Sequence, residues 1–206
     1  MEDRPSYLPP VAIGEPMRAG SVGQVVESRQ ADFATGDLVQ TTGGWQDFVV
    51  VAPGQGPMGL SKVPEGVSAQ MMLSVLGITG LTAYFGLLDL GNPQPGETVL
   101  VSGAAGATGS VAGQIARIKG CNVVGIAGGP EKCAWLKDEA GFHDVIDYKN
   151  ENVNARIGAA CPKKLDVYFD VACALAITEG HIGHGRAVIK CEASHRARSA
   201  AAVGDL

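Results

Sequence analysis

A glycine-rich stretch in the middle of the chain, Gly103-Ala104-Ala105-Gly106-Ala107-Thr108-Gly109, has the composition and spacing of a phosphate-binding loop. The first glycine permits a tight turn, the second lets backbone N–H groups reach a pyrophosphate, and the third lets a helix pack close to the sheet. The N-terminus of that helix adds unpaired N–H groups and the positive end of its dipole. The loop therefore predicts dinucleotide binding, with Gly106 and Gly109 as the main contact points.

Three glycines alone are a weak signal, because an ordinary strand-to-helix turn can also require them. The context favours the dinucleotide. A strand-forming run ends at Ser102, and after the loop Val111, Ile115 and Ile118 recur at i, i+4 and i+7, the spacing of one apolar helix face. Strand, glycine loop and helix are thus predicted in the order that a dinucleotide-binding unit needs.

The end of the next predicted strand indicates which dinucleotide binds. NAD-binding units carry an acid about 20 residues beyond the glycines, which bonds the ribose 2′-hydroxyl. Here the sequence is Ala127-Gly128-Gly129-Pro130-Glu131-Lys132, without an acid at the strand end. A carboxylate would repel a 2′-phosphate, whereas the open backbone at Gly128 and the ammonium of Lys132 would attract it. NADP(H) is therefore the predicted cofactor, although Lys132 without the glycines would equally fit an ordinary exposed lysine.

Other groups of reactive residues predict less. His181 and His184 could be a pair of metal ligands, but a glycine lies between them and no third ligand is evident, so a polar loop is favoured. Ser102 and Ser110 flank the glycine loop without the Gly-x-Ser-x-Gly elbow of a hydrolase. The five cysteines are odd in number and widely spaced, so neither a disulfide framework nor a zinc cage is predicted.

Strands and helices alternate around the loop. The predicted strands are Thr98–Ser102, Asn122–Ile126, Asp144–Asp147 and Leu165–Asp170, and the predicted helices are Ser110–Lys119, Glu131–Ala140 and Asn150–Ala160. This alternation is typical of the α/β class with a doubly wound parallel sheet. Residues 186–190 could add one more strand, and residues 172–179 could be helical.

The first part of the chain has a different pattern. Short β-type runs at Ser21–Glu27, Asp37–Gln40 and Trp45–Val51 are separated by glycine and proline, which predicts a small β-barrel or sandwich. The apolar stretch Ser68–Leu90 predicts two helical pieces broken near Gly77–Gly80. We therefore expect a β domain of residues 1–67 and a dinucleotide-binding Rossmann domain of residues 68–206 that is incomplete at its C-terminal end.

With these motifs in place, the chain resembles the zinc-independent medium-chain dehydrogenase/reductases, specifically the prostaglandin reductase and leukotriene hydroxydehydrogenase group. The likeness runs from about Leu8 to Asp170 and is carried by Gly80-Leu81-Thr82-Ala83-Tyr84-Phe85-Gly86-Leu87-Leu88, the glycine loop with Gln114-Ile115-Ala116, the Glu131-Lys132 pair and Val145-Ile146-Asp147-Tyr148-Lys149. The resemblance implies an NADPH-dependent reductase of the carbon–carbon double bond in α,β-unsaturated ketones or aldehydes. A quinone reductase is the main competitor, because related zinc-free enzymes share the same loop.

The resemblance also implies roles for particular residues. The pyrophosphate would lie in the loop that Gly103 begins, against Gly106, Ala107, Thr108 and Gly109. The 2′-phosphate would be held by Lys132 and Tyr148, beside Gly128. The early β-rich part would be a partial GroES-like domain, no zinc ligands are expected, and no catalytic residue is assigned.

The sequence departs from the group in one important place. Phe169-Asp170-Val171-Ala172-Cys173-Ala174 stands where the group has Phe-Asp-Asn-Val-Gly-Gly, so the asparagine that faces the cofactor is lost. Relatives also begin earlier, which suggests a chain truncated at both ends. A catalytically inactive NADPH-binding or partner-binding fragment is therefore the alternative prediction.

Composition limits the classes of partner. With 206 residues, 46% of them hydrophobic, the chain is typical of a globular protein. A net charge of −5 provides no general attraction for nucleic acid or anionic membrane. The N-terminus lacks a signal-peptide pattern, and no apolar run approaches the roughly 20 residues that span a bilayer. We expect a cytoplasmic, soluble protein with a small-molecule enone, enal or quinone substrate, and the resemblance implies a homodimer.

Overall fold

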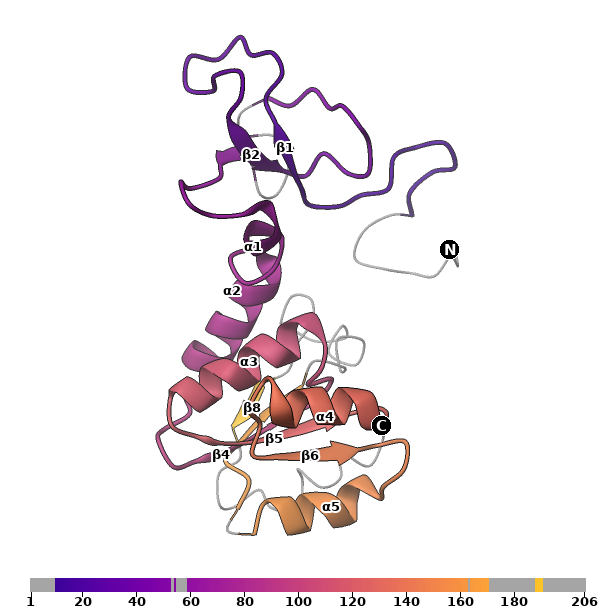
Figure 1. Cartoon of the computed structure of the whole chain (residues 1–206), viewed down its shortest axis with the longest axis vertical. Coiled ribbons are helices and arrows are strands. Elements are labelled where there is room, and N and C mark those ends of the chain that lie inside the picture. Colours follow the sequence, from indigo (N-terminus) through magenta and orange to yellow (C-terminus); the bar gives the residue numbers. More distant parts are fainter. Residues whose placement is uncertain (1–9, 53, 55–58, 163, 171–187, 191–206) are drawn as a thin grey trace. The chain divides into compact units, whose positions relative to one another are not determined.

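The computed structural model describes residues 10–52, 54, 59–162, 164–170 and 188–190. The chain forms two compact units, Met1–Ile78 and Thr79–Leu206 (Figure 1). The division between these units falls at the start of helix α2 (Ile78–Phe85). It therefore comes later in the chain than the domain boundary expected after residue 67.

The first unit contains a three-stranded antiparallel sheet. Its order is β1 (Ser21–Gln24), β2 (Leu38–Thr41), β3 (Ser61–Lys62), with β2 in the centre. The predicted strand Trp45–Val51 is wrong, because these residues pair with no strand of the described chain. The side chains of Trp45 and Val50 are 77% and 99% exposed. Apolar alternation cannot produce a strand when no neighbouring strand accepts its hydrogen bonds.

The apolar stretch after this sheet forms short helices, as predicted. Helix α1 (Ala69–Leu73) is capped by Ser68, whose hydroxyl accepts the Met71 N–H at 3.2 Å. Helix α2 belongs to the second unit and continues into a π-helix, η1 (Gly86–Gly91), which the sequence did not predict. Leu87 of η1 is fully buried in the core of the second unit.

The second unit is built on a five-stranded sheet of order β6-β5-β4-β7-β8. The elements are β4 (Thr98–Val101), α3 (Ala107–Ile118), β5 (Asn122–Ala127), α4 (Pro130–Asp138), β6 (Asp144–Asp147), α5 (Val153–Ala160), β7 (Val167–Phe169) and β8 (Val188–Lys190). Strands β6, β5, β4 and β7 are connected through helices and run parallel to one another. Strand β8 pairs antiparallel with β7. The α/β class with a doubly wound parallel sheet is confirmed.

The chain reverses its direction of winding at β4. It adds β5 and β6 on one side of β4 and then returns to place β7 on the other side. At this switch point Val101 of β4 lies level with Gly125 of β5 and Phe169 of β7. In open α/β sheets, ligands bind in the crevice beyond the carboxyl ends of strands at such a point.

Helices α3 and α4 cover one face of the sheet and α5 covers the other (Figure 1). Because side chains alternate along a strand, Val99 and Val101 join the first core, while Leu100 joins the second. The first core also takes Ala112, Ala116, Leu136 and Phe142, and the second takes Val124, Ile146 and Tyr168. Both faces of the central strands are therefore buried, as is typical of parallel sheets.

Helix α3 packs mainly through its small residues, and of the predicted apolar face only Val111 and Ile115 contact the core. Ile118 is 85% exposed, and Val111 and Ile115 are only partly buried. The buried face is formed by Thr108, Gly109, Ala112, Gly113 and Ala116. These small side chains let the helix axis approach the sheet closely, and a Cβ added to Gly113 would overlap the ring of Phe142.

Candidate functional site

The glycine loop forms a tight connection between β4 and α3. Gly103 has a φ of +52°, a conformation that favours glycine, and its carbonyl accepts the Gly106 N–H at 2.8 Å. The Ala104 N–H donates to the carbonyl of Ile126 in β5 at 3.0 Å. The loop is thus held by its own turn and by the neighbouring strand. Helix α3 begins at Ala107, three residues before the predicted start at Ser110.

The third glycine of the loop has no room for a side chain. A Cβ on Gly109 would overlap the Gly103 carbonyl oxygen and lie 2.9 Å from the Ala104 Cα. Both neighbours are backbone atoms, which cannot rotate away. A Cβ on Gly106 would lie 3.0 Å from the same carbonyl oxygen. Gly109 therefore allows the first turn of the helix to lie directly against the loop.

The first turn of α3 presents backbone donors that the helix itself does not use. Gly106 is the N-cap and makes no side-chain capping bond, and the first helical bond runs from the Ser110 N–H to the Gly106 carbonyl at 2.9 Å. The N–H groups of Ala107, Thr108 and Gly109 consequently have no acceptor within the helix. Such groups, at the positive end of the helix dipole, suit the oxygens of a pyrophosphate.

A buried polar pair lies at the carboxyl ends of the two strands that flank the switch point. The Ser102 hydroxyl donates to Asp170 Oδ1 at 2.5 Å, and the Ser102 N–H donates to the Phe169 carbonyl at 3.0 Å. Both side chains are buried. The pair fixes the start of the glycine loop against the end of β7. No local pattern predicts it, because its two members are 68 residues apart.

The second loop of the site joins β5 to α4 and lies against the residue after β6. A Cβ on Gly128 would lie 2.7–2.8 Å from the Cε1, Cζ and Oη atoms of Tyr148, so the tyrosine ring covers this glycine directly. The Tyr148 N–H donates to the Ala127 carbonyl at 3.1 Å. Tyr148 is 56% exposed, and Lys132 is exposed in the first turn of α4. The structure thus brings Gly128 and Tyr148 together on a surface open to solvent.

Asp147, at the end of β6, ties these two loops together. Its Oδ1 accepts the N–H groups of Gly129 at 2.8 Å and Lys149 at 3.1 Å, and its Oδ2 accepts the Asn150 side-chain amide at 2.7 Å. The Gly129 N–H, followed by the Asn150 amide, holds the pKa of Asp147 below its ordinary value. The sequence suggested that the glycine backbone of this loop is open to a ligand. In the structure the Gly129 N–H is not open, because it donates to Asp147.

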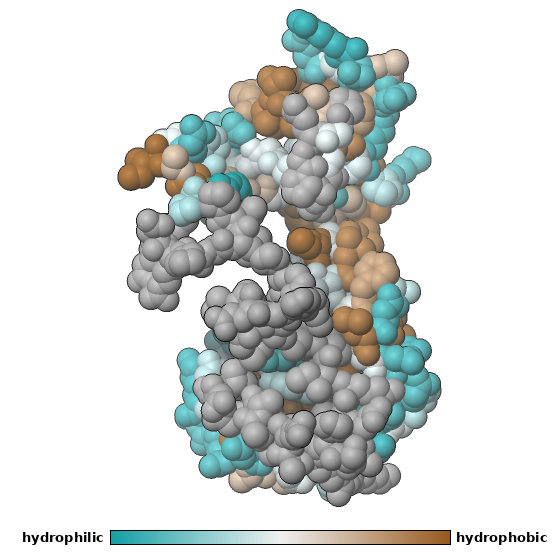
Figure 2. All heavy atoms as spheres, turned by 180° about the vertical axis from the view of Figure 1, so that it is seen from behind, coloured by the Kyte–Doolittle hydropathy of each residue, from teal (hydrophilic) through white to brown (hydrophobic). Residues whose placement is uncertain are grey.

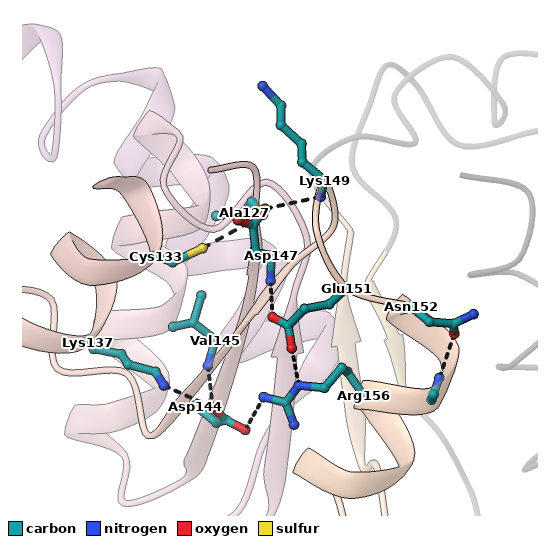
Figure 3. A network of polar contacts seen from close by, with 11 residues as sticks. Ala127, Cys133, Lys137, Asp144, Val145, Asp147, Lys149, Glu151, Asn152 and Arg156 are labelled. Atoms are coloured by element: carbon teal, nitrogen blue, oxygen red, sulfur yellow. Dashed lines mark hydrogen bonds and ion pairs between the residues drawn. The ribbon is translucent and has the colours of Figure 1, made fainter. Parts of the chain in front are cut away.

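Figure 3 shows that Asp147 belongs to a longer polar network along β6 and α5. Glu151 Oε1 accepts the Asp147 N–H at 2.9 Å, and Glu151 Oε2 pairs with Arg156 Nε at 2.5 Å. Arg156 and Lys137 both pair with Asp144, at 3.1 and 3.3 Å. The pKa of Glu151 is lowered, mainly by the Asp147 N–H and also by Arg156. The pKa of Arg156 is raised, mainly by Glu151 and also by Asp144. For Asp144, burial opposes ionisation, but the Val145 N–H, Arg156 and Lys137 outweigh it and lower the pKa.

Comparison with known proteins gives consistent matches over both units. A family model described as the N-terminal domain of oxidoreductase matches residues 1–60, and one described as zinc-binding dehydrogenase matches residues 107–180. NADPH-dependent curcumin reductase of Escherichia coli is 44% identical over 82% of this chain and 48% of its own length. Bovine prostaglandin reductase 1 is 43% identical over 76% of this chain and 48% of its own length.

The chain belongs to the medium-chain dehydrogenase/reductases. Within this family it belongs to the zinc-independent group of the prostaglandin reductases, as its motifs indicated. A crystal structure of CurA in complex with NADPH, from Vibrio vulnificus, superposes with a TM-score of 0.72 at 41% identity, over 82% of this chain and 49% of that one. The chain spans about half the length of the curated relatives it matches.

One of the two family models refers to zinc, yet the part of this chain that the structure describes holds no cluster of three or more His, Cys, Asp or Glu side chains suited to a metal ion. Cys121, Cys133 and Cys161 are free thiols, and burial raises the pKa of Cys161 to about 11. His181 and His184 lie outside the described residues, as do Val171–Ala174. Among the described helices, none is both long and apolar enough to cross a membrane.

Proposed function

We propose that this chain is the NADPH-binding part of a reductase that acts on the carbon–carbon double bond of α,β-unsaturated ketones or aldehydes. The observation that carries the proposal is the pairing of two surfaces in one unit. One is the glycine loop with the first turn of α3, at the switch point of the sheet. The other is the contact of Gly128 with Tyr148, beyond the ends of β5 and β6.

The first surface fits the pyrophosphate of a dinucleotide. Gly109 removes the side chain that would push α3 away from the loop, and the N–H groups of Ala107, Thr108 and Gly109 supply donors for phosphate oxygens. Gly103 and Gly106 supply the turn. When bound, NADPH would supply the hydride. The role of these residues is to bind and orient it and to complement its charge.

The second surface favours a 2′-phosphate over a free 2′-hydroxyl. No carboxylate stands at the end of β5, where NAD-binding units place one, and the next acid, Glu131, lies in the first turn of α4. Lys132, exposed in the first turn of α4, would add a positive charge, and the exposed Tyr148 would add a hydroxyl. Gly128 is needed here because any larger residue would displace the tyrosine ring.

The substrate class rests on membership of the prostaglandin reductase group. A quinone reductase is the second candidate, since zinc-free enzymes of both kinds share the glycine loop. No catalytic residue is assigned to the described part of the chain. A homodimer and a cytoplasmic location, both expected from the sequence, stay predictions.

A cofactor titration tests the proposal most directly. The folded chain is titrated with NADPH and with NADH while cofactor fluorescence is followed, and the titrations are repeated with Lys132→Ala. As a matched control, Lys119→Ala removes an exposed lysine at the far end of α3. We expect Lys132→Ala to weaken NADPH binding about tenfold, the loss of one charge-assisted contact, and Lys119→Ala to leave it unchanged. A folded chain that does not bind NADPH would refute the proposal, and an enone and a quinone panel then separates the two substrate classes.

A further inference from the structure

We propose that Asp147 is a positioning residue for cofactor choice, because it ties the loop after β5 to the loop after β6 and so holds Gly128 and Tyr148 together as one 2′-phosphate surface. This inference rests on the proposed NADPH-binding function. It concerns a residue that would not contact the phosphate itself. Its effect would be exerted through the two loops that do.

The geometry supports a tie between separate segments. Gly129, the N-cap of α4, has a φ of +99° and belongs to the loop after β5, whereas Lys149 and Asn150 follow β6. The carboxylate of Asp147 accepts one hydrogen bond from each of these three residues. One side chain therefore fixes both loops. Its own position is fixed in turn, since its N–H donates to Glu151.

The tie sets the contact between glycine and tyrosine. The Tyr148 N–H donates to the Ala127 carbonyl, and the Tyr148 ring lies over Gly128. The next residue, Gly129, is the one whose N–H donates to Asp147. Gly129 has a positive φ and open space around the position of a Cβ, so none of the described residues packs closely on that side of it. Without the carboxylate, the loop after β5 would lose this side-chain restraint on Gly129.

An acid so close to a phosphate site requires an explanation. Asp147 is buried, and its oxygens accept from the backbone of Gly129 and Lys149 and from the Asn150 amide. Figure 3 shows the bond from Lys149. Three donors offset its charge, and the positive charge of Lys149, two residues further along the chain, also lowers its pKa. It therefore differs from the acid of NAD-binding units, which follows the second strand and bonds the ribose directly. In this chain the acid lies one strand further out and acts on the loops.

The test compares cofactor preference in Asp147→Ala and Asp147→Asn with Asp138→Asn, which removes one exposed acid from the far end of α4. Dissociation constants for NADPH and NADH are measured on each folded variant. We expect Asp147→Ala to raise the dissociation constant for NADPH about tenfold and the one for NADH less than about twofold. The preference for NADPH over NADH should therefore fall. In Asp147→Asn the remaining amide oxygen can still accept hydrogen bonds, but the amide nitrogen cannot accept one from the Asn150 amide. The loss of NADPH affinity should therefore be smaller than in Asp147→Ala. Asp138→Asn should leave the preference unchanged.

A second measurement needs no cofactor. Hydrogen exchange at the Gly129 amide of the free chain should accelerate in Asp147→Ala and stay slow in Asp138→Asn. Equal loss of NADPH and NADH binding in Asp147→Ala would overturn the inference, because that is the signature of a general structural defect. Tighter NADPH binding by Asp147→Asn would also overturn it, since charge repulsion would then outweigh positioning. If the wild-type chain binds no NADPH while Gly129 exchange still depends on Asp147, the proposed function fails, and the cofactor role with it, although the tie itself is present.

Discussion

Replacing Gly109 by alanine should damage both the stability of the second unit and its affinity for NADPH. The added methyl would overlap the Gly103 carbonyl oxygen and lie 2.9 Å from the Ala104 Cα. Because both contacts are backbone atoms of the same loop, the strain can be relieved only by moving the loop away from α3. That movement would separate the turn at Gly103 from the N–H groups of the helix.

The size of the effect follows from two opposing terms. Overpacking typically costs about 1–3 kcal/mol, and the upper part of that range applies where backbone must move. Alanine in a helix gains up to about 1 kcal/mol over glycine. The net loss of unfolding free energy should therefore be roughly 1–2 kcal/mol. Loss of one hydrogen bond to a charged phosphate, about 1.5–3 kcal/mol, would weaken NADPH binding by about 10- to 100-fold.

Gly158 provides a matched control, because it also lies in a helix, α5, and a Cβ there would meet no atom of the described residues within 4 Å. Gly158→Ala should therefore show the gain in helix propensity alone, with unchanged NADPH affinity. Urea unfolding followed by circular dichroism measures stability, and cofactor fluorescence measures binding without denaturant. If Gly109→Ala binds NADPH within twofold of the wild type and is as stable as Gly158→Ala, the steric argument for the loop is wrong.

Three further predictions concern stability. Gly113→Ala should lose about 1–3 kcal/mol, because its Cβ would overlap the buried ring of Phe142, and Gly158→Ala again gives the reference. Burial raises the pKa of Cys161 from 9.0 to about 11. The stabilising contribution of the protonated thiol should therefore be full below pH 9 and lost as the pH rises through about 11. Cys161→Ala should flatten the pH dependence of the unfolding free energy in that range. Arg156→Gln should destabilise the chain at pH 7, because Arg156 pairs with Asp144 and Glu151. The pKa values of these two carboxylates are lowered from 3.8 and 4.5 in the fold. The difference in unfolding free energy from the wild type should therefore shrink as the pH falls below those ordinary values. Equal pH profiles for either variant and the wild type would contradict the corresponding prediction.

The alternation of strands and helices after the turn at residues 93–96 could be predicted because each central strand is buried on both faces. Such strands appear as short, continuous apolar runs, and the strand Asp144–Asp147 was predicted with the bounds that it has. Where burial is one-sided or absent, the pattern misled. Trp45–Val51 has strand-like residues without a pairing strand among the described residues. In α3 the predicted residues Val111 and Ile115 pack against the core only in part and Ile118 is exposed, because close approach to the sheet requires the small residues of the helix.

The residues that organise the site were harder to predict, because their effect depends on where a side chain points. The sequence places an acid at the end of the strand Asp144–Asp147, and an acid near a 2′-phosphate counts against NADP by charge alone. In the structure that carboxylate points to Gly129, 18 residues away, and to its own loop. Ser102 and Asp170 meet in the same way across 68 residues. Residue type at a loop predicts what could be bound there, whereas hydrogen bonds from outside the loop decide whether its shape is held. Cofactor choice in this chain is therefore better argued from Asp147 and Gly128 together than from the absence of an acid at the end of β5.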